Sequence, residues 1–190
     1  DYDINKDVIH VSVNFYNEIW VIDHSTSTSQ AESNSGGNYG KGGDLIYRYG
    51  NPSAYKNTEG TTIFNNNHFP NHLEGDVQGR GNMLVYVNNY GDLLQSIVYE
   101  LELPEVFSLS PNVNNEPNIV WSYTNPDMYA PKFSGAVRLQ NGNTLICEGD
   151  YGYWEVSQSG EVVWKYDGDT NFWRGYSYDI ASPALNNLDF

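Results

Sequence analysis

One strand-like pattern occurs three times in this chain and constrains its fold more than any other feature. In residues 45–52, 119–126 and 162–168, two apolar residues are followed by an aromatic residue, a polar residue, a second aromatic residue and a turn. Short runs of β-branched and aromatic residues that end in turn-forming residues are typical of β-strands. The aromatic positions Trp121 and Trp164 lie 43 residues apart, which is about the length of one four-stranded repeat in an all-β protein.

The clearest hairpin lies between two of these segments. Residues 134–139 and 144–148 are strand-like and flank Asn141-Gly142, a pair that favours a two-residue turn because both positions need positive φ. Two further strand-like runs follow, 152–156 and 161–166. Four antiparallel strands in about 35 residues match one blade of a β-propeller, and no segment shows a sustained helical period. The chain is therefore predicted to be all-β, a β-propeller built of four-stranded antiparallel blades with few and short helices.

The number of blades predicts an incomplete ring. We expect approximate blades at 8–52, 64–126 and 133–168, followed by a C-terminal tail. Three blades are too few, because a closed propeller needs about four to eight. An open arc would leave blade faces uncovered, so residues 1–190 are interpreted as a partial β-propeller domain.

Composition excludes several classes of partner. Against 24 acidic residues there are only 9 basic ones, for a net charge of −15, so we expect no nucleic acid, which is bound by clustered Lys and Arg. No apolar run approaches the roughly 20 residues of a membrane span, and the first residues lack signal-peptide features. The single cysteine, Cys147, excludes an internal disulfide and is expected in the core.

Four histidines are the main candidates for chemistry. His10 alternates with apolar residues inside a strand, and we expect a structural or surface role for it. His24 directly follows a strand and opens the long polar loop 25–43. His68 and His72 are expected in a loop, since Pro70 between them argues against a helix. A zinc site would need further ligands, and the sequence has no HExxH or cysteine pattern.

No cofactor or metal is expected. The glycine-rich stretch 36–43 lacks the spacing of a P-loop. The acidic segment 167–171 lacks the glycine and glutamate of a calcium loop, and is interpreted as a turn after a strand. The sequence also has no Gly-x-Ser-x-Gly nucleophile elbow.

Several segments together resemble the bacterial arylsulfate sulfotransferase family. They are Glu-Ile-Trp-Val-Ile-Asp-His-Ser-Thr (18–26), Gly-Gly-Asp-Leu-Ile-Tyr-Arg-Tyr-Gly-Asn-Pro (42–52), Gly-Arg-Gly-Asn-Met-Leu-Val-Tyr (79–86) and the hairpin 134–149 with 154–156. The match runs in order from about residue 9 to residue 173, and it corresponds to the C-terminal portion of such an enzyme. The resemblance implies a six-bladed propeller, usually periplasmic or lipid-anchored, so we expect a periplasmic or secreted protein.

The resemblance also implies an activity and a site. The family moves a sulfuryl group from a phenolic sulfate ester to a phenol through a sulfohistidine, without a nucleotide sulfate donor. By position, His68 corresponds to the nucleophilic histidine, Arg48 to the arginine that clamps the sulfuryl group, and His24 to an assisting histidine. The family pattern follows its nucleophile with an acidic residue and alanine, whereas Phe69 and Pro70 follow His68, so His72 remains a second candidate.

These roles are chemically coherent. A neutral imidazole is a competent nucleophile near pH 7, a guanidinium binds anionic oxygens in a bidentate manner, and a second imidazole can transfer a proton to the leaving group. The expected partners are a phenolic sulfate donor and a phenol acceptor, and a homo-oligomer is left open. The alternative is a non-catalytic propeller module that binds a protein or a glycan through its loops.

Overall fold

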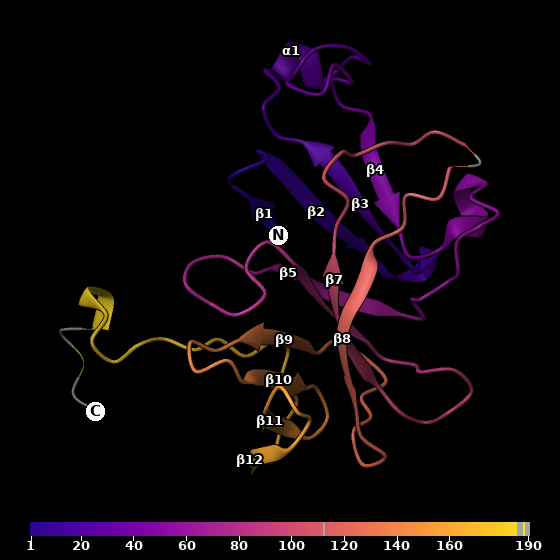
Figure 1. The fold of residues 1–190 in the computed structure, drawn as a ribbon. Coiled ribbons are helices and arrows are strands. Elements are labelled where there is room, and N and C mark those ends of the chain that lie inside the picture. Colours follow the sequence, from indigo (N-terminus) through magenta and orange to yellow (C-terminus); the bar gives the residue numbers. More distant parts are fainter. Residues whose placement is uncertain (112, 186–187, 189–190) are drawn as a thin grey trace.

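The computed structural model describes residues 1–111, 113–185 and 188, and its core is three four-stranded antiparallel sheets (Figure 1). In each sheet the strands lie in sequence order. The first sheet contains β1 (Tyr2–Asp3), β2 (Val8–Val13), β3 (Glu18–Asp23) and β4 (Leu45–Tyr49). The second contains β5 (Asn67–His72), β6 (Met83–Val87), β7 (Ile97–Glu102) and β8 (Asn118–Thr124). The third contains β9 (Gly135–Arg138), β10 (Thr144–Glu148), β11 (Gly152–Val156) and β12 (Val162–Asp167).

The predicted all-β class is confirmed, and helices are few and short in the described part of the chain. They are α1 (Thr28–Ala31) and the 3₁₀ turns Asn14–Tyr16, Pro52–Tyr55 and Pro183–Leu185. The three repeated aromatic segments form β4, β8 and β12, each of which is the last strand at one edge of its sheet. The repeat therefore marks equivalent positions in three equivalent sheets. The first sheet begins at Tyr2, earlier than the expected start at residue 8.

The second sheet is packed between the other two, because both of its faces are apolar. All five residues of β6 are buried, and successive residues of a strand point to opposite faces. Met83, Val85 and Val87 pack against residues of the first sheet. Leu84 and Tyr86 pack against residues of the third sheet, such as Ile146 and Trp154. The continuous apolar run of β6 thus supplies two separate cores.

A buried ion pair joins the second and third sheets. Nη2 of Arg138 on β9 lies 2.5 Å from Oε2 of Glu100 on β7, and both side chains are almost fully buried. The other carboxylate oxygen of Glu100 accepts a hydrogen bond from Asn82 at 2.6 Å. Burial lowers the pKa of Arg138, and the charge of Glu100 opposes this shift. Burial of either charge is therefore tolerated only because the opposite charge lies beside it.

Residues 67–72 form strand β5 and not the expected loop. The pairing of β5 with β6 is interrupted between His68 and Asn71, and Phe69 in this bulge has a φ of 48°. Pro70 is tolerated because it lies at this interruption on the edge strand of the sheet, where no ladder hydrogen bond is required of it. The prediction was wrong because Pro70 and the four Asn residues of 65–72 mimic a turn-rich loop.

The predicted hairpin between β9 and β10 is confirmed, but its turn has three residues and not two. Arg138 pairs with Thr144, and the amide of Leu139 donates to the carbonyl of Asn143 at 2.8 Å. Within this turn only Gly142 has positive φ, at 87°. The amide of Gly142 donates to the carbonyl of Leu139 at 3.0 Å. A turn that ends in a left-handed glycine is the usual three-residue hairpin connection.

We predict that Glu100→Ala lowers the free energy of unfolding by about 3–5 kcal/mol, because it leaves the buried guanidinium of Arg138 without its carboxylate. The matched control is Glu102→Ala, which removes an exposed carboxylate from the same strand and should change stability by less than about 0.5 kcal/mol. Urea unfolding followed by tryptophan fluorescence measures both. Equal losses in the two variants would contradict a special role for the buried pair.

Candidate functional site

A cavity of about 550 Å³ lies beside β2, β5 and the C-terminal tail. Strand β5 contacts both β2 of the first sheet and β9 of the third, and the cavity collects side chains from the first sheet, the second sheet and the tail. The polar and aromatic side chains that line the cavity are His10, Ser12, Asn14, His68, Phe69, Asn71, Arg174 and Tyr176, together with Asp1. Of the sequence-predicted site residues, only His68 lines it.

His68 is held as a neutral imidazole. It is paired with Tyr86 of β6 and shares the face of the sheet that packs toward the third sheet. Its Nε2 is buried, without a hydrogen-bond partner among the described residues. Burial lowers the pKa of His68, and the positive charge of Arg174 lowers it further. At pH 7 its ring therefore keeps a lone pair on one nitrogen, as a nucleophile needs.

Arg174 was not found from the sequence, because it comes from the tail after β12. Aromatic contacts hold this tail in place: Phe133 and Trp173 stack with their ring centroids 3.9 Å apart. The guanidinium carbon of Arg174 lies 4.6 Å from the centre of the Phe69 ring. Within the described residues Arg174 makes no ion pair, so its charge is available to an anion. The signal in the sequence was the run of aromatic residues around it, 172–178.

His10 also lines this cavity, and it is buried as a core residue would be. The residue is 2% exposed, and neither ring nitrogen has a hydrogen-bond partner in the part of the chain that the structure describes. Burial lowers its pKa to about 3, and the charge of His72 adds to this shift. His10 is therefore neutral at pH 7.

Arg48 and His24 lie away from the cavity. Arg48 on β4 forms two contacts with the fully buried carboxylate of Glu18, with Nε–Oε2 at 2.6 Å and Nη2–Oε1 at 2.5 Å. His24 is about half exposed, and its Nδ1 lies 2.7 Å from Oδ1 of Asp7. The structure thus does not bring His24, Arg48 and His68 to one cavity, and the predicted catalytic roles of the first two stay predictions.

His68 and His72 point to opposite faces of the second sheet. His68 pairs with Tyr86 and His72 with Met83, and these partners are three residues apart on the regular strand β6, so their side chains lie on opposite faces. The bulge of β5 causes this, since residues four apart on a regular strand would share a face. His72 faces the first sheet, where its ring stacks on His10 with centroids 6.5 Å apart.

Cys147 is a core residue, as predicted. It is buried on β10 as a free thiol, and burial raises its pKa to about 12. A thiol in this state is protonated at neutral pH and does not act as a nucleophile.

No protein-family model, no curated protein and no solved structure matches this chain. The resemblance to arylsulfate sulfotransferases therefore rests on the sequence segments alone. Among the described residues, no helix is long and apolar enough to cross a membrane.

We predict that Arg48→Met lowers the free energy of unfolding by about 2–3 kcal/mol, because the buried carboxylate of Glu18 loses its charged partner. The double variant Arg48→Met/Glu18→Gln should recover part of this loss, since the uncompensated charge is gone. Chemical denaturation of both variants measures the difference. Unchanged stability in Arg48→Met would argue that Arg48 serves a substrate and not the fold.

Proposed function

We propose that this chain is part of a β-propeller and transfers a sulfuryl group from an aryl sulfate ester to a phenol, with His68 as the nucleophile. The observation that supports this most directly is that one cavity holds a neutral imidazole and a guanidinium that has no ion-pair partner among the described residues. Burial and the charge of Arg174 lower the pKa of His68, and both residues line the same space of about 550 Å³. A nucleophile and an anion-binding group are the two parts that sulfuryl transfer requires.

The reaction has two balanced steps. In the first, the lone pair of the His68 ring attacks sulfur, the bond between sulfur and the bridging oxygen breaks, and the phenolate leaves with the electron pair. In the second, an acceptor phenol attacks the same sulfur, the N–S bond breaks, and the phenol proton passes to solvent. Arg174 is assigned the role expected of Arg48, because its guanidinium can neutralise the sulfuryl oxygens as charge grows on them.

The cavity walls suit a phenolic substrate. The rings of Phe69 and Tyr176 meet edge to face with centroids 6.0 Å apart, and both line the cavity. Aromatic side chains of this kind pack against a phenol ring by apolar contact and by offset or edge-on geometry.

The central prediction concerns His68. His68→Asn should lower the turnover of p-nitrophenyl sulfate, with phenol as acceptor, by at least about a thousandfold. The wild type, mixed with donor alone, should gain the mass of one SO₃ group, located on His68 by fragmentation mass spectrometry. Arg174→Ala should raise KM for the ester, whereas Lys41→Ala, which removes an exposed lysine of the 25–43 loop, should not.

The outcome separates this proposal from its alternatives. An adduct on His72 would move the nucleophile to the opposite face of β5. Absence of turnover and of any adduct in the wild type would favour a non-catalytic binding module. That alternative has its own support in β12, where the rings of Trp164 and Tyr166 stack with centroids 6.2 Å apart and each residue is 48% exposed.

The pH dependence of kcat/KM is a further prediction. Protonation of His68 removes its lone pair, so activity should fall on the acid side with a midpoint below 6.5, the ordinary value for histidine. Because the folded-state pKa is the lower one, His68 also contributes stability above pH 6.5 that is lost as the pH falls through its folded-state pKa. A pH–rate profile, with the His68 ring followed by NMR, measures both. An acid midpoint above 6.5 would contradict the assignment.

A further inference from the structure

Asp3, His72 and Glu74 converge on one point between the first and second sheets. One ligand atom of each lies within 4.8 Å of the others. Nε2 of His72 lies 3.6 Å from Oδ2 of Asp3, and its Nδ1 lies 3.5 Å from Oε1 of Glu74. Ligands bound at about 2.1 Å in a tetrahedral zinc site are separated by about 3.4 Å. One ion binds only one of the two ring nitrogens, so at most one of these two contacts is a separation between two ligand atoms, and the spacing of the whole set is the 4.8 Å limit.

One buried nitrogen at this point has no hydrogen-bond partner among the described residues, which is a second observation. The side chain of His72 is 7% exposed, and its Nδ1 makes no hydrogen bond to the residues that the structure describes. The ring of His10 stacks on that of His72, and its two nitrogens also lack partners among the described residues, but His10 lines the other cavity. Buried polar atoms without partners are rare in folded proteins because each one loses its hydration without replacement.

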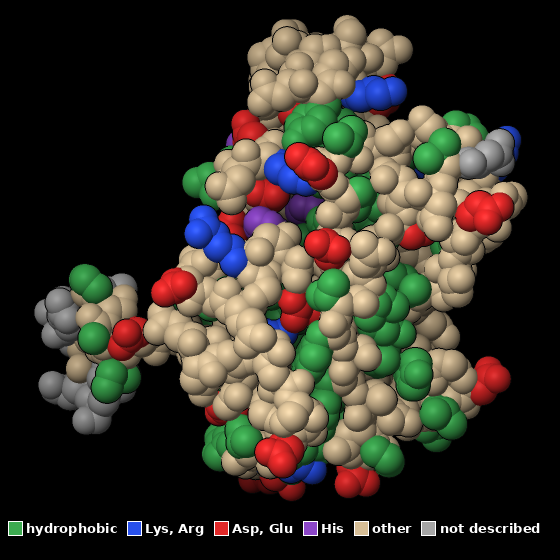
Figure 2. All heavy atoms as spheres, viewed as in Figure 1, with side chains coloured by type: hydrophobic (Ala, Val, Ile, Leu, Met, Phe, Trp, Pro, Cys, Tyr) green, Lys and Arg blue, Asp and Glu red, His purple; other side chains and the backbone are tan. Residues whose placement is uncertain are grey.

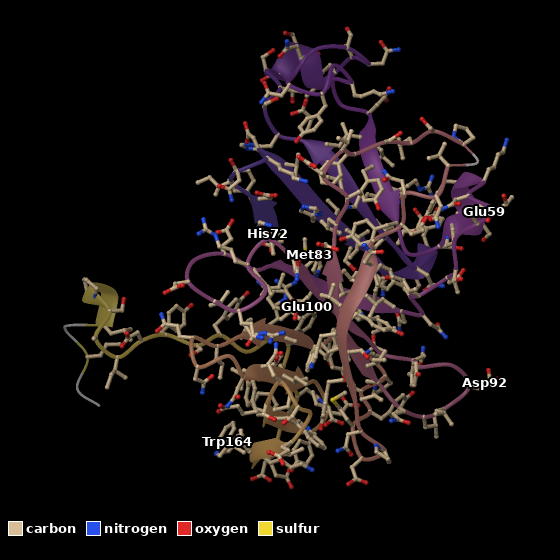
Figure 3. All side chains as sticks on the ribbon, viewed as in Figure 1. Glu59, His72, Met83, Asp92, Glu100 and Trp164 are labelled. Atoms are coloured by element: carbon tan, nitrogen blue, oxygen red, sulfur yellow. The ribbon has the colours of Figure 1, made fainter. Side chains whose placement is uncertain are left out.

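We propose that Asp3, His72 and Glu74 bind a divalent cation of the zinc class. Figure 3 labels His72, and Figure 2 shows histidine atoms in purple recessed among acidic and basic side chains in the same part of the view. The imidazole is a borderline ligand and the two carboxylates are hard ones, a mixed set that suits Zn²⁺ and Mn²⁺, whereas Mg²⁺ and Ca²⁺ prefer oxygen ligands alone. The two carboxylates neutralise the charge of the ion.

The site has an entrance and an open coordination position. A cavity of about 290 Å³ is lined by all three ligands, and Lys6 and Arg80 also line it. Three protein ligands leave a fourth position of a tetrahedral ion to water or to a small anion. Glu74 is exposed, so its carboxylate can turn toward the ion without disturbing the core.

The proposed ion would link two sheets. Asp3 ends β1 of the first sheet, His72 ends β5 of the second, and Glu74 follows two residues later. No local motif reveals this site, because Asp3 is far in the sequence from His72 and Glu74. The proposal is independent of the sulfuryl-transfer site, since His72 and His68 lie on opposite faces of the second sheet.

Zinc binding by the whole chain tests the proposal. After treatment with EDTA and buffer exchange, calorimetric titration with ZnCl₂ should show one site, and added Zn²⁺ should raise Tm. Co²⁺ in place of Zn²⁺ should give the intense visible absorption of a four-coordinate ion with a nitrogen ligand. Glu74→Gln should weaken zinc binding at least tenfold. Asp76→Asn, which neutralises an exposed carboxylate two residues away, should leave it unchanged.

The variants also control for misfolding. Glu74 is on the surface, so Glu74→Gln is expected to fold, and circular dichroism verifies this before titration. His72→Gln should likewise lose zinc binding, although its burial makes loss of stability an added effect. The proposal is overturned if the wild type binds no zinc, or if Glu74→Gln and Asp76→Asn weaken binding equally.

Discussion

The whole structure depends on a second sheet that is buried on both faces. Strand β6 is apolar at every position, and its alternating side chains enter two cores, one shared with the first sheet and one with the third. Neither outer sheet could cover its inner face without it. This sheet therefore sets the order of the three layers, and it places its own first strand, β5, between β2 and β9. Each of the two proposed sites includes one histidine of that strand.

The bulge in β5 divides the candidate chemistry into two sites. A regular strand would have directed His68 and His72 to one face, and a single cluster of histidines would have resulted. The bulge at Phe69 and Pro70 turns them apart. His68 meets Arg174 and a cavity with aromatic walls, whereas His72 meets Asp3, Glu74 and the ring of His10. The proposed nucleophile and one ligand of the proposed cation site therefore lie on the same strand without sharing a face.

The sequence predicted the strands well where the signal was local. Hydrophobic alternation and turn residues located β2, β3, β10 and β11, and the repeated pattern located the last strand of each sheet. It failed at β5, because Asn and Pro are read as a loop when no partner strand is known. It also misjudged the β9–β10 turn by one residue, since Asn-Gly is compatible with both a two-residue and a three-residue connection. Both errors concern backbone geometry that depends on how a strand pairs with its neighbour.

The candidate site shows the same contrast between what local sequence patterns predict and what the packing of the sheets determines. By itself the sequence determined the all-β class, the three repeated units and the acidic composition, because these follow from residue type and period. His68 became a candidate nucleophile only through the resemblance to a known family. Only the tertiary structure decided that Arg48 pairs with Glu18, that Arg174 comes beside His68 from the tail, and that Asp3 meets His72. The physical reason is distance along the chain. Contacts between residues tens of positions apart arise from the packing of whole sheets, and no local pattern records them.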